Sequence, residues 1–373
     1  MECKGIFLSA CCRRNSTKNR FRWVFCQLEV LRHCFPSSVR QILEELPESL
    51  DETYERILKE IRKPKQEHAH RLLQCLVAAV RPLRVEELAE VLAFDFTAEG
   101  IPNLNLDWRW ENQEEAVMSA CSSLVIVVKN RDSRIVQFSH FSVKEFLTAN
   151  RLAEPIRDVS RYHIRLEAAH TVLAQACLGV LLRLDDCADR DSIEDFPLAR
   201  YAAQYWPRHA RFENASLRIE DGMECLFDAD KLHFATWLWI YDEYSGRSMS
   251  TMSPKKPEVV PLYYAARFEF RDLAEHLIAK HPEHVNAWVG DMTILSHIVE
   301  RGGRAEILSL LLEHGADMEG QSRGKTPLSR ASWKGNVEAG QCLLDHGANI
   351  NARNNLGETP LFSAVYHGQV EFA

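Results

Sequence analysis

One segment carries the residue types of a phosphate-binding loop. Gly320–Thr326 reads GQSRGKT, and a loop that cradles phosphate ends in Gly-Lys followed by a Ser or Thr whose hydroxyl binds Mg²⁺. Here three residues separate the two glycines instead of four, and the segment runs into a Thr-Pro-Leu triplet rather than linking a buried strand to a helix. We therefore interpret it as part of a repeat hairpin, and we expect no nucleotide or other cofactor there.

Other side chains that bind metals or catalyse reactions are present, but not in a known arrangement. Five histidines lie near one another in two groups: His68 and His70, then His276, His281 and His284. Their spacings match neither HExxH nor a zinc finger, and no nearby carboxylate or cysteine is spaced to complete a site. Asp185–Asp191 lacks the Gly and closing Glu of a calcium loop, and no GxSxG supplies a serine nucleophile. We expect surface histidines, a solvated loop, no metal and no enzymatic activity.

The C-terminal third repeats itself. The triplet Thr326-Pro327-Leu328 returns 33 residues later as Thr359-Pro360-Leu361, and the same step backwards reaches Thr293-Ile294-Leu295 and Val260-Pro261-Leu262. A TPL triplet at this period is typical of ankyrin repeats. We predict three repeats, at about 258–290, 291–323 and 324–356, and a fourth that stops inside its second helix. The first is degenerate, with His281-Pro282-Glu283 in place of Gly-Ala.

Each position of the repeat has a physical reason. A Thr hydroxyl caps the unpaired amides of a helix, and Pro at the first helical position loses no hydrogen bond. Gly335 permits the turn between the paired helices, and Gly347 suits a left-handed C-cap. Asn349 to Gly357 then form a projecting hairpin. The sequence predicts a solenoid of helix pairs.

Composition describes an ordinary globular protein of 373 residues, with 46% hydrophobic and 26% charged residues. The net charge of −8 argues against a general binder of nucleic acid or anionic membranes. Eleven cysteines without a CxxC pair indicate a reducing compartment rather than a disulfide framework. No apolar run approaches the ~20 residues that span a bilayer, so we expect a cytoplasmic protein. Residues 1–20 are expected to be a disordered lead, although Cys11-Cys12 beside Arg13-Arg14 leaves lipidation or a weak transit peptide open.

Residues 66–150 have the order of a winged helix. A helix, a turn at Pro82 and a second helix from Val85 are followed by two β-rich runs, SSLVIVV and RIVQFSH, around a turn at Lys129–Ser133. This range contains twelve acidic and eight basic residues, and Glu86, Glu87 and Glu90 lie on the expected recognition helix. Phosphate repulsion therefore favours a structural winged helix over one that binds DNA.

Several stretches resemble a known family. FRWVFCQLEVLRHC and LPESLDETYERIL are similar to the end of the nucleotide-binding module of fungal NACHT–ankyrin proteins, which are relatives of NOD-like receptors. SHFSVKEFLTANRLA resembles the closing part of the GPI inositol-deacylase-type winged helix, a domain that adjoins a hydrolase without forming its active site. The resemblance implies a helical connector before the repeats. The phosphate loop of the nucleotide-binding module is missing N-terminal to Phe21.

Together these features predict a mainly α fold: a winged-helix domain with a small β-hairpin, a helical connector and a C-terminal ankyrin solenoid. The expected boundaries are a lead at 1–20, a NACHT-like helical segment at 21–65, the winged helix at 66–150, the connector at 151–250 and repeats at 258–373. Gly246–Pro257 is the expected linker, and Trp237 and Trp239 are interpreted as packing residues, with a partner anchor as the alternative.

The predicted function is non-enzymatic protein binding and regulation, which the resemblance narrows to the sensing and relay half of a NACHT–ankyrin switch. The hypothetical partner contacts are Ser329, Ser332, Trp333, Asn354, Asn355 and Phe362, with Trp333 as the first choice of anchor. Two alternatives stay open. One is a winged-helix regulator that binds DNA through Lys129 and Arg131, and the other is an incomplete product of an ATP-dependent switch. Apolar faces around Phe21–Leu31 and at Val365, Val370 and Phe372 then predict self-association.

Overall fold

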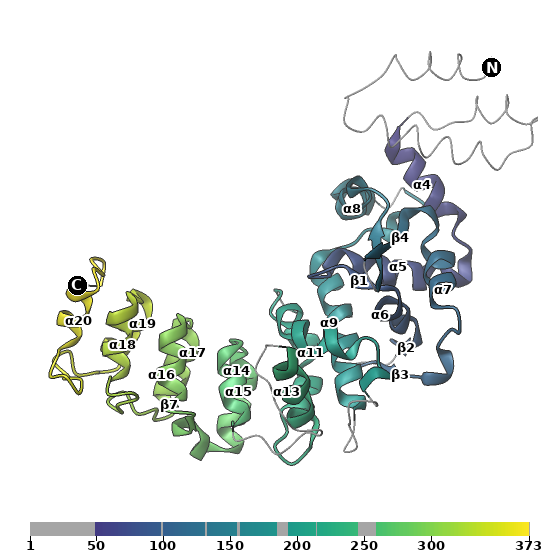
Figure 1. Ribbon diagram of the computed structural model, residues 1–373. Coiled ribbons are helices and arrows are strands. Elements are labelled where there is room, and N and C mark those ends of the chain that lie inside the picture. Colours follow the sequence, from purple (N-terminus) through teal and green to yellow (C-terminus); the bar gives the residue numbers. More distant parts are fainter. Residues whose placement is uncertain are drawn as a thin grey trace, which may run out of the picture. The chain divides into compact units, whose positions relative to one another are not determined.

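The computed structural model describes residues 49–97, 100–130, 133–154, 157–184, 193–213, 215–244 and 259–372 (Figure 1). The expected lead, the apolar face at Phe21–Leu31, the acidic segment Asp185–Asp191 and the linker Gly246–Pro257 lie outside these residues. The chain divides into two compact units. The first contains Asn105–Leu173 together with the residues up to Phe94, and the second contains Asp95–Leu104 and the chain from Ala174 onward.

The first unit is a winged helix. Its helices are α4 (Leu50–Glu60), α5 (Lys63–Ala78), α6 (Val85–Glu90), α7 (Gln113–Cys121) and α8 (Phe141–Thr148), and its sheet strands are β1 (Leu83–Arg84), β4 (Val125–Asn130) and β5 (Ser133–Phe138). The antiparallel sheet has the order β1-β5-β4, with Val136 opposite both Leu83 and Val127. The predicted hairpin is confirmed, and its strand pairing continues past Lys129 and Arg134 to Asn130 and Ser133.

Short elements complete this region of the chain. They are the 3₁₀ turns at Val91–Ala93, Leu106–Trp108, Ser122–Leu124, Asn150–Ala153 and Ser160–Tyr162, and the two-stranded ribbon of β2 (Phe94–Asp95) and β3 (Asn103–Leu104). The expected helix from Val85 is α6, which ends at Glu90 and tightens into the 3₁₀ turn at Val91–Ala93. Helix α7 was not among the elements that the sequence indicated before the hairpin.

Helix α4 shows how local sequence and packing agree. The Ser49 hydroxyl accepts a hydrogen bond from the Glu52 amide at 3.2 Å and so caps the helix. The apolar side chains of one face of the chain here, Tyr54, Ile57, Leu58 and Ile61, are buried. The Tyr54 hydroxyl lies 2.9 Å from the Ser142 hydroxyl, which joins α4 to α8. This helix therefore packs on the winged helix itself, although the boundary at residue 66 stays a prediction.

The second unit begins with the helical connector. After α9 (Leu166–Arg183), which crosses the boundary between the units, the chain forms α11 (Ala199–Ala210), a 3₁₀ turn (Ser216–Arg218), α12 (Glu220–Leu226) and α13 (His233–Tyr244). Trp237 and Trp239 are buried, and the Trp237 indole donates to the Ala203 carbonyl at 3.0 Å. Their interpretation as packing residues is confirmed.

The repeats follow as paired helices in a row (Figure 1). The pairs are α14 (Pro261–Arg267) with α15 (Arg271–Lys280), α16 (Ile294–Arg301) with α17 (Ala305–Glu313), and α18 (Pro327–Lys334) with α19 (Val337–Asp345), followed by α20 (Pro360–Tyr366). Between the first two pairs lie the 3₁₀ turn η8 (Pro282–Asn286) and the ribbon β6 (Trp288–Val289) and β7 (Met292–Thr293). The predicted mainly α architecture is confirmed.

Candidate functional site

The repeat framework has the local geometry that the TPL triplets predict. Thr293, Thr326 and Thr359 each cap a helix, with the hydroxyl accepting from the amide three residues later at 3.3 Å in all three cases. Gly335 ends α18 with a φ of +70°, and Gly347 has a φ of +92°. A side chain at such φ values is strained, which explains the glycines. The framework therefore holds the hairpins and first helices in a regular row.

Three of the six predicted partner contacts are interior residues, which corrects that part of the prediction. Ser329 and Ser332 are fully buried, and their hydroxyls bond to the Thr326 hydroxyl and the Leu328 carbonyl at 3.2 and 2.8 Å. Asn354 is buried too, and its side-chain oxygen accepts the amides of Leu356 and Glu358 at 2.9 Å each. These side chains build the repeat and its hairpin, so they do not face a partner.

The other three predicted contacts reach the surface. Trp333 is half-buried, whereas Asn355 and Phe362 are exposed. A chain of ring contacts connects Trp333 to Phe362: Trp333 to His367 at 6.0 Å, His367 to Tyr366 at 5.1 Å, and Tyr366 to Phe362 at 6.0 Å between centroids. Trp333 belongs to α18, Phe362 and Tyr366 to α20, and His367 is the C-cap of α20. We call these four residues the aromatic strip. Tyr366 and His367 were not among the predicted contacts; the four-residue spacing of Phe362 and Tyr366 on α20 was the available signal for Tyr366.

Two lysines flank one end of the aromatic strip. The Nζ atoms of Lys325 and Lys334 each lie 4.3 Å from the Trp333 ring centroid, within the range of cation–π attraction. Burial and then the nearby Arg330 lower the pKa of Lys325. Arg330 itself is buried, donates to Glu300 at 2.8 Å, and bonds to the Ser322 carbonyl. The arginine therefore joins neighbouring repeats, while the two lysines place positive charge beside the Trp333 ring.

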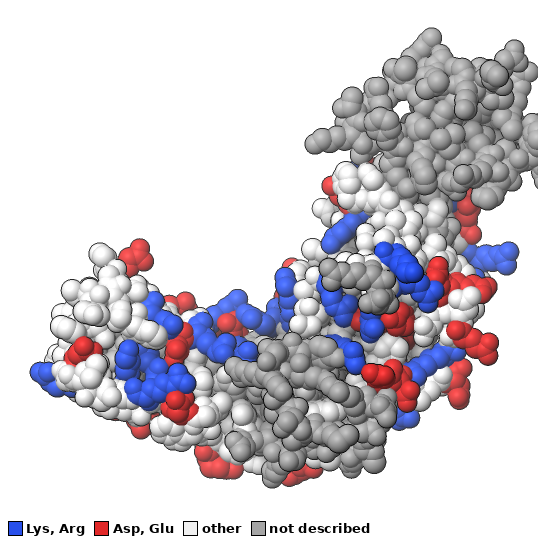
Figure 2. Space-filling model, in the orientation of Figure 1, with Lys and Arg blue, Asp and Glu red and all other residues white. Residues whose placement is uncertain are grey.

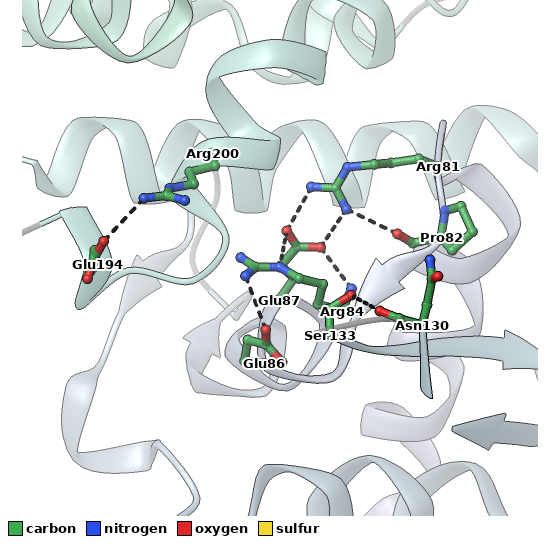
Figure 3. Close-up of polar contacts among 9 residues, drawn as sticks. All are labelled: Arg81, Pro82, Arg84, Glu86, Glu87, Asn130, Ser133, Glu194 and Arg200. Carbon is green, nitrogen blue, oxygen red and sulfur yellow. Dashed lines mark hydrogen bonds and ion pairs between the residues drawn. The ribbon is translucent and has the colours of Figure 1, made fainter. Parts of the chain in front are cut away.

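In the winged helix, Glu87 and Glu90 of α6 are buried, and Figure 3 shows Glu87 between Arg81 and Arg84. The fully buried Glu87 carboxylate accepts two hydrogen bonds from Arg81, at 2.7 and 2.8 Å, and one from the Arg84 amide at 2.8 Å. Glu90 is also buried and pairs with Arg109. Sequence analysis expected these carboxylates to repel phosphate from an exposed helix. Instead they neutralise arginines inside the unit, because α6 is largely buried.

The helix before the hairpin is α7, and it is acidic. In a helix-turn-helix pair the second helix enters the groove, and here that position belongs to α7 rather than α6. Its sequence, QEEAVMSAC, contains two glutamates and no Lys or Arg. Glu114 pairs with Arg134 of β5 at 2.6 Å. On the face shown in Figure 2, basic and acidic side chains are interspersed.

The sequence signal that marks the start of α7 is Asn112, whose side-chain oxygen accepts the Glu115 amide at 3.1 Å.

The structure also places the histidines and cysteines. His68 is exposed, while His70 is half-buried against the Tyr162 ring, and burial lowers the pKa of His70. His281 and His284 approach Glu283, an arrangement that sequence analysis did not expect. Burial raises the pKa values of Cys75 and Cys121 to about 12, so neither thiol is a ready nucleophile.

Several apolar side chains near the last described helix are exposed, as sequence analysis expected. Val365 and Val370 are 65% and 84% exposed, whereas Phe372 is half-buried against Gly340. Self-association through this region stays a prediction. No helix in the part of the chain that the structure describes is both long and apolar enough to cross a membrane.

Comparisons with known proteins find both modules. A family model of ankyrin repeats, three copies, matches residues 262–354, and a model of the GPI inositol-deacylase winged helix domain matches residues 54–156. Ankyrin repeats and this winged helix are therefore present in the chain. The ankyrin repeats support a role in protein interaction.

Relatives extend this result. "Azaphilone pigments biosynthesis cluster protein L" of Monascus ruber is 32% identical over 294 residues, which is 74% of this chain and 61% of the relative. The chain thus spans less than two thirds of that protein. Ankyrin repeat and SAM domain-containing protein 6 of mouse is 30% identical over 116 residues, 30% of this chain and 13% of its own length. Ankyrin repeat and KH domain-containing protein 1 of human is 49% identical over 51 residues, 13% and 2% of the two chains.

Proposed function

We propose that this chain is a non-enzymatic regulatory scaffold of the cytoplasm that holds a protein partner on the aromatic strip of its repeats. The observation that carries the proposal is the half-exposed Trp333, flanked by Lys325 and Lys334 and continued by His367, Tyr366 and Phe362. Aromatic residues dominate the energetics of protein interfaces, and repeat solenoids present extended binding surfaces. The flanking lysines favour a partner with acidic residues around an apolar anchor.

A pair of tryptophan variants tests this proposal. Proteins near the tagged chain are identified by proximity labelling in its native cells, and each candidate is then titrated against the purified chain. Trp333→Ala is expected to weaken binding at least tenfold because it removes a central aromatic contact. Trp288→Ala is the control, since Trp288 is 54% exposed but lies on β6, outside the aromatic strip. Equal affinities of the two variants would contradict the proposal.

Charge reversal tests the chemistry of the partner separately. Lys325→Glu with Lys334→Glu places two negative charges beside Trp333. Binding of an acidic partner should weaken, and its salt dependence should decrease. If the affinity of a partner is unchanged by the charge reversal, that partner does not contact the lysines. Weaker binding of the same partner to Trp333→Ala would still support binding at the aromatic strip.

Within this role, we propose that the chain acts as the sensing and relay half of a NACHT–ankyrin type switch. The support is the order of its modules, a GPI inositol-deacylase-type winged helix followed by ankyrin repeats, together with the DETYERIL stretch of α4. Sequencing of the native transcript tests it. An in-frame phosphate loop upstream of Met1 is the expected result, and a transcript whose coding sequence starts at Met1 overturns the ATP-dependent part.

DNA binding is the weaker candidate. The acidic α7 and the pairing of Arg81, Arg84 and Arg134 with glutamates leave little positive charge where a duplex would bind. Measurement of duplex binding at low salt, with Lys129→Glu as a variant, is expected to show no salt-sensitive complex that depends on Lys129.

A further inference from the structure

His281 occupies a repeat position that has a packing role elsewhere. Its equivalent 33 residues later is His314, and His346 follows in the next repeat. The Nδ1 atoms of His314 and His346 lie 2.9 and 2.8 Å from the carbonyls of Leu310 and Cys342, four residues earlier on the same helices. The Nδ1 atom of His281 lies instead 3.3 Å from Glu283 Oε1. The His281 ring therefore contacts a carboxylate, whereas its equivalents in the next two repeats contact a helix carbonyl.

A second imidazole lies against the same carboxylate. Nε2 of His284 is 3.9 Å from Glu283 Oε1, and the His281 and His284 rings lie 4.9 Å apart at an interplanar angle of 27°. One potential ligand atom from each of the three residues lies within 4.8 Å of the other two. A tetrahedral ion bound at 2.0–2.1 Å holds its ligands about 3.3 Å apart. The 3.3 Å between His281 Nδ1 and Glu283 Oε1 already equals that spacing, and the ligand atoms of the cluster are at most 4.8 Å apart.

The backbone holds this cluster in place. Pro282 begins η8 and restricts the chain between the two histidines, and the buried Val285 anchors the turn. Asn286 bonds to the second repeat: its side-chain nitrogen Nδ2 donates to the Gly315 carbonyl at 3.0 Å, and its side-chain oxygen accepts the Asp317 amide at 2.8 Å. The ligands thus lie on a turn that is fixed at both ends.

Two further carboxylates lie near the cluster. A small hollow beside the cluster is lined by His276, Lys280, His281 and His284 with the carboxylates of Glu224 and Asp228. Glu224 pairs with His276 at 3.2 Å, and Lys280 lies 3.8 Å from Asp228. Two imidazoles and a carboxylate are donors that Zn²⁺ accepts in proteins, whereas Ca²⁺ and Mg²⁺ require more oxygen ligands.

We propose that His281, Glu283 and His284 form a binding site for one Zn²⁺ ion on the first repeat. Three protein ligands leave a fourth tetrahedral position for water. The first repeat has Pro282-Glu283 where later repeats have Gly315-Ala316 and Gly347-Ala348, so it lacks their glycine cap at the end of the second helix. The ion compensates by joining the end of α15 to η8, and through η8 it steadies the contact with the second repeat.

Calorimetric titration of the metal-free full chain with ZnCl₂ tests the site. One binding event is expected in the wild type, and it should weaken at least tenfold in His284→Ala and in Glu283→Gln. His314→Ala is the matched control, because it removes the equivalent histidine of the next repeat and should leave that event unchanged. Millimolar Mg²⁺ should not compete.

Thermal unfolding provides a second measurement. Saturating Zn²⁺ should raise the Tm of the wild type and of His314→Ala but not that of His284→Ala, while circular dichroism confirms that each metal-free variant is folded. Binding by other groups of the chain, cysteines included, would persist in all variants and is thereby separated. Zn²⁺ affinity and Tm shift that are the same in His284→Ala as in the wild type overturn the proposal.

Discussion

Arg81 and Glu87 form a two-point ion pair in which Nη1 and Nη2 of the arginine lie 2.8 and 2.7 Å from the two carboxylate oxygens (Figure 3). Glu87 is fully buried, whereas a third of the Arg81 side chain is exposed. Arg84 completes the arrangement through its amide and its Nε atom, at 2.8 and 3.0 Å from the same carboxylate. One acidic side chain therefore joins the turn before α6 to the start of the helix.

Removal of this carboxylate should destabilise the winged helix. Glu87→Ala is expected to lower the free energy of unfolding by about 3 kcal/mol, because it deletes a buried, hydrogen-bonded partner of two arginines. Glu86→Ala is the control: Glu86 pairs with Arg84 at 3.2 Å near the surface, and its loss should cost less than about 1 kcal/mol. Urea denaturation followed by circular dichroism measures both. Similar costs would contradict the structural role of Glu87.

The same residue predicts a pH dependence. Burial by itself raises the pKa of Glu87, but the hydrogen bonds and charges of Arg81 and Arg84 outweigh it, so the pKa is lower than usual. The unfolded value is about 4.3, so the stabilisation is fully present above that pH and is lost as the pH falls through the lower, folded value. Stability measured from pH 6 down to pH 2 should therefore decrease less in Glu87→Gln than in the wild type. If the stability of the two proteins falls equally with pH, Glu87 is not the source of the pH dependence.

A third prediction concerns the aromatic core of the second unit. The Trp206 ring is fully buried, stacks on Phe270 at 5.4 Å and meets Trp237 edge to face at 5.7 Å. Trp206→Ala should lower the free energy of unfolding by about 4 kcal/mol because it leaves a large cavity. Trp288→Ala removes an exposed ring and should change it by less than about 0.5 kcal/mol. Chemical denaturation compares the two, and a mild effect of Trp206→Ala would mean that the connector and first repeat do not share a core.

The helix caps of the repeats provide a fourth test. Thr326→Ala removes the hydroxyl that accepts the Ser329 amide and should cost about 1 kcal/mol. Thr326→Ser keeps the acceptor and should cost clearly less. Thermal unfolding of the two variants separates the loss of the capping hydroxyl in Thr326→Ala from the loss of the methyl group in Thr326→Ser. An equal decrease in stability would mean that packing of the side chain, and not the cap, is responsible.

The cysteines should react in a defined order. Burial raises the pKa values of Cys75 and Cys121 to about 12, whereas Cys225 is partly exposed. Iodoacetamide at pH 8 should therefore alkylate Cys225 well before the two buried thiols, and addition of urea should remove the difference. Mass spectrometry of the peptides follows each site. Early labelling of Cys75 or Cys121 in the folded chain would contradict their burial.

Local rules explain why much of the fold is visible in the sequence. The cap at Ser49, the caps at Thr326 and Thr359, and the positive φ of Gly335 all depend on residues within four positions of one another. The 33-residue period adds the stacking of the repeats, because each repeat buries its apolar face only against a neighbour. Helix α7 was missed because the tryptophan-rich segment before it has no clear period, although Asn112 marks its start.

The sequence alone therefore determined the class of the protein: a winged helix followed by a connector and ankyrin repeats, with Trp333 as a surface candidate. Tertiary structure decided which polar side chains face outward. Ser329, Ser332 and Asn354 lie inside because neighbouring helices and hairpin amides bind them, and Glu87 turns inward because Arg81 and Arg84 surround it. The approach of His281, Glu283 and His284 likewise depends on ring orientation within a turn. Side-chain direction is set by packing against partners distant in sequence or by fine turn geometry, and neither is encoded in residue spacing.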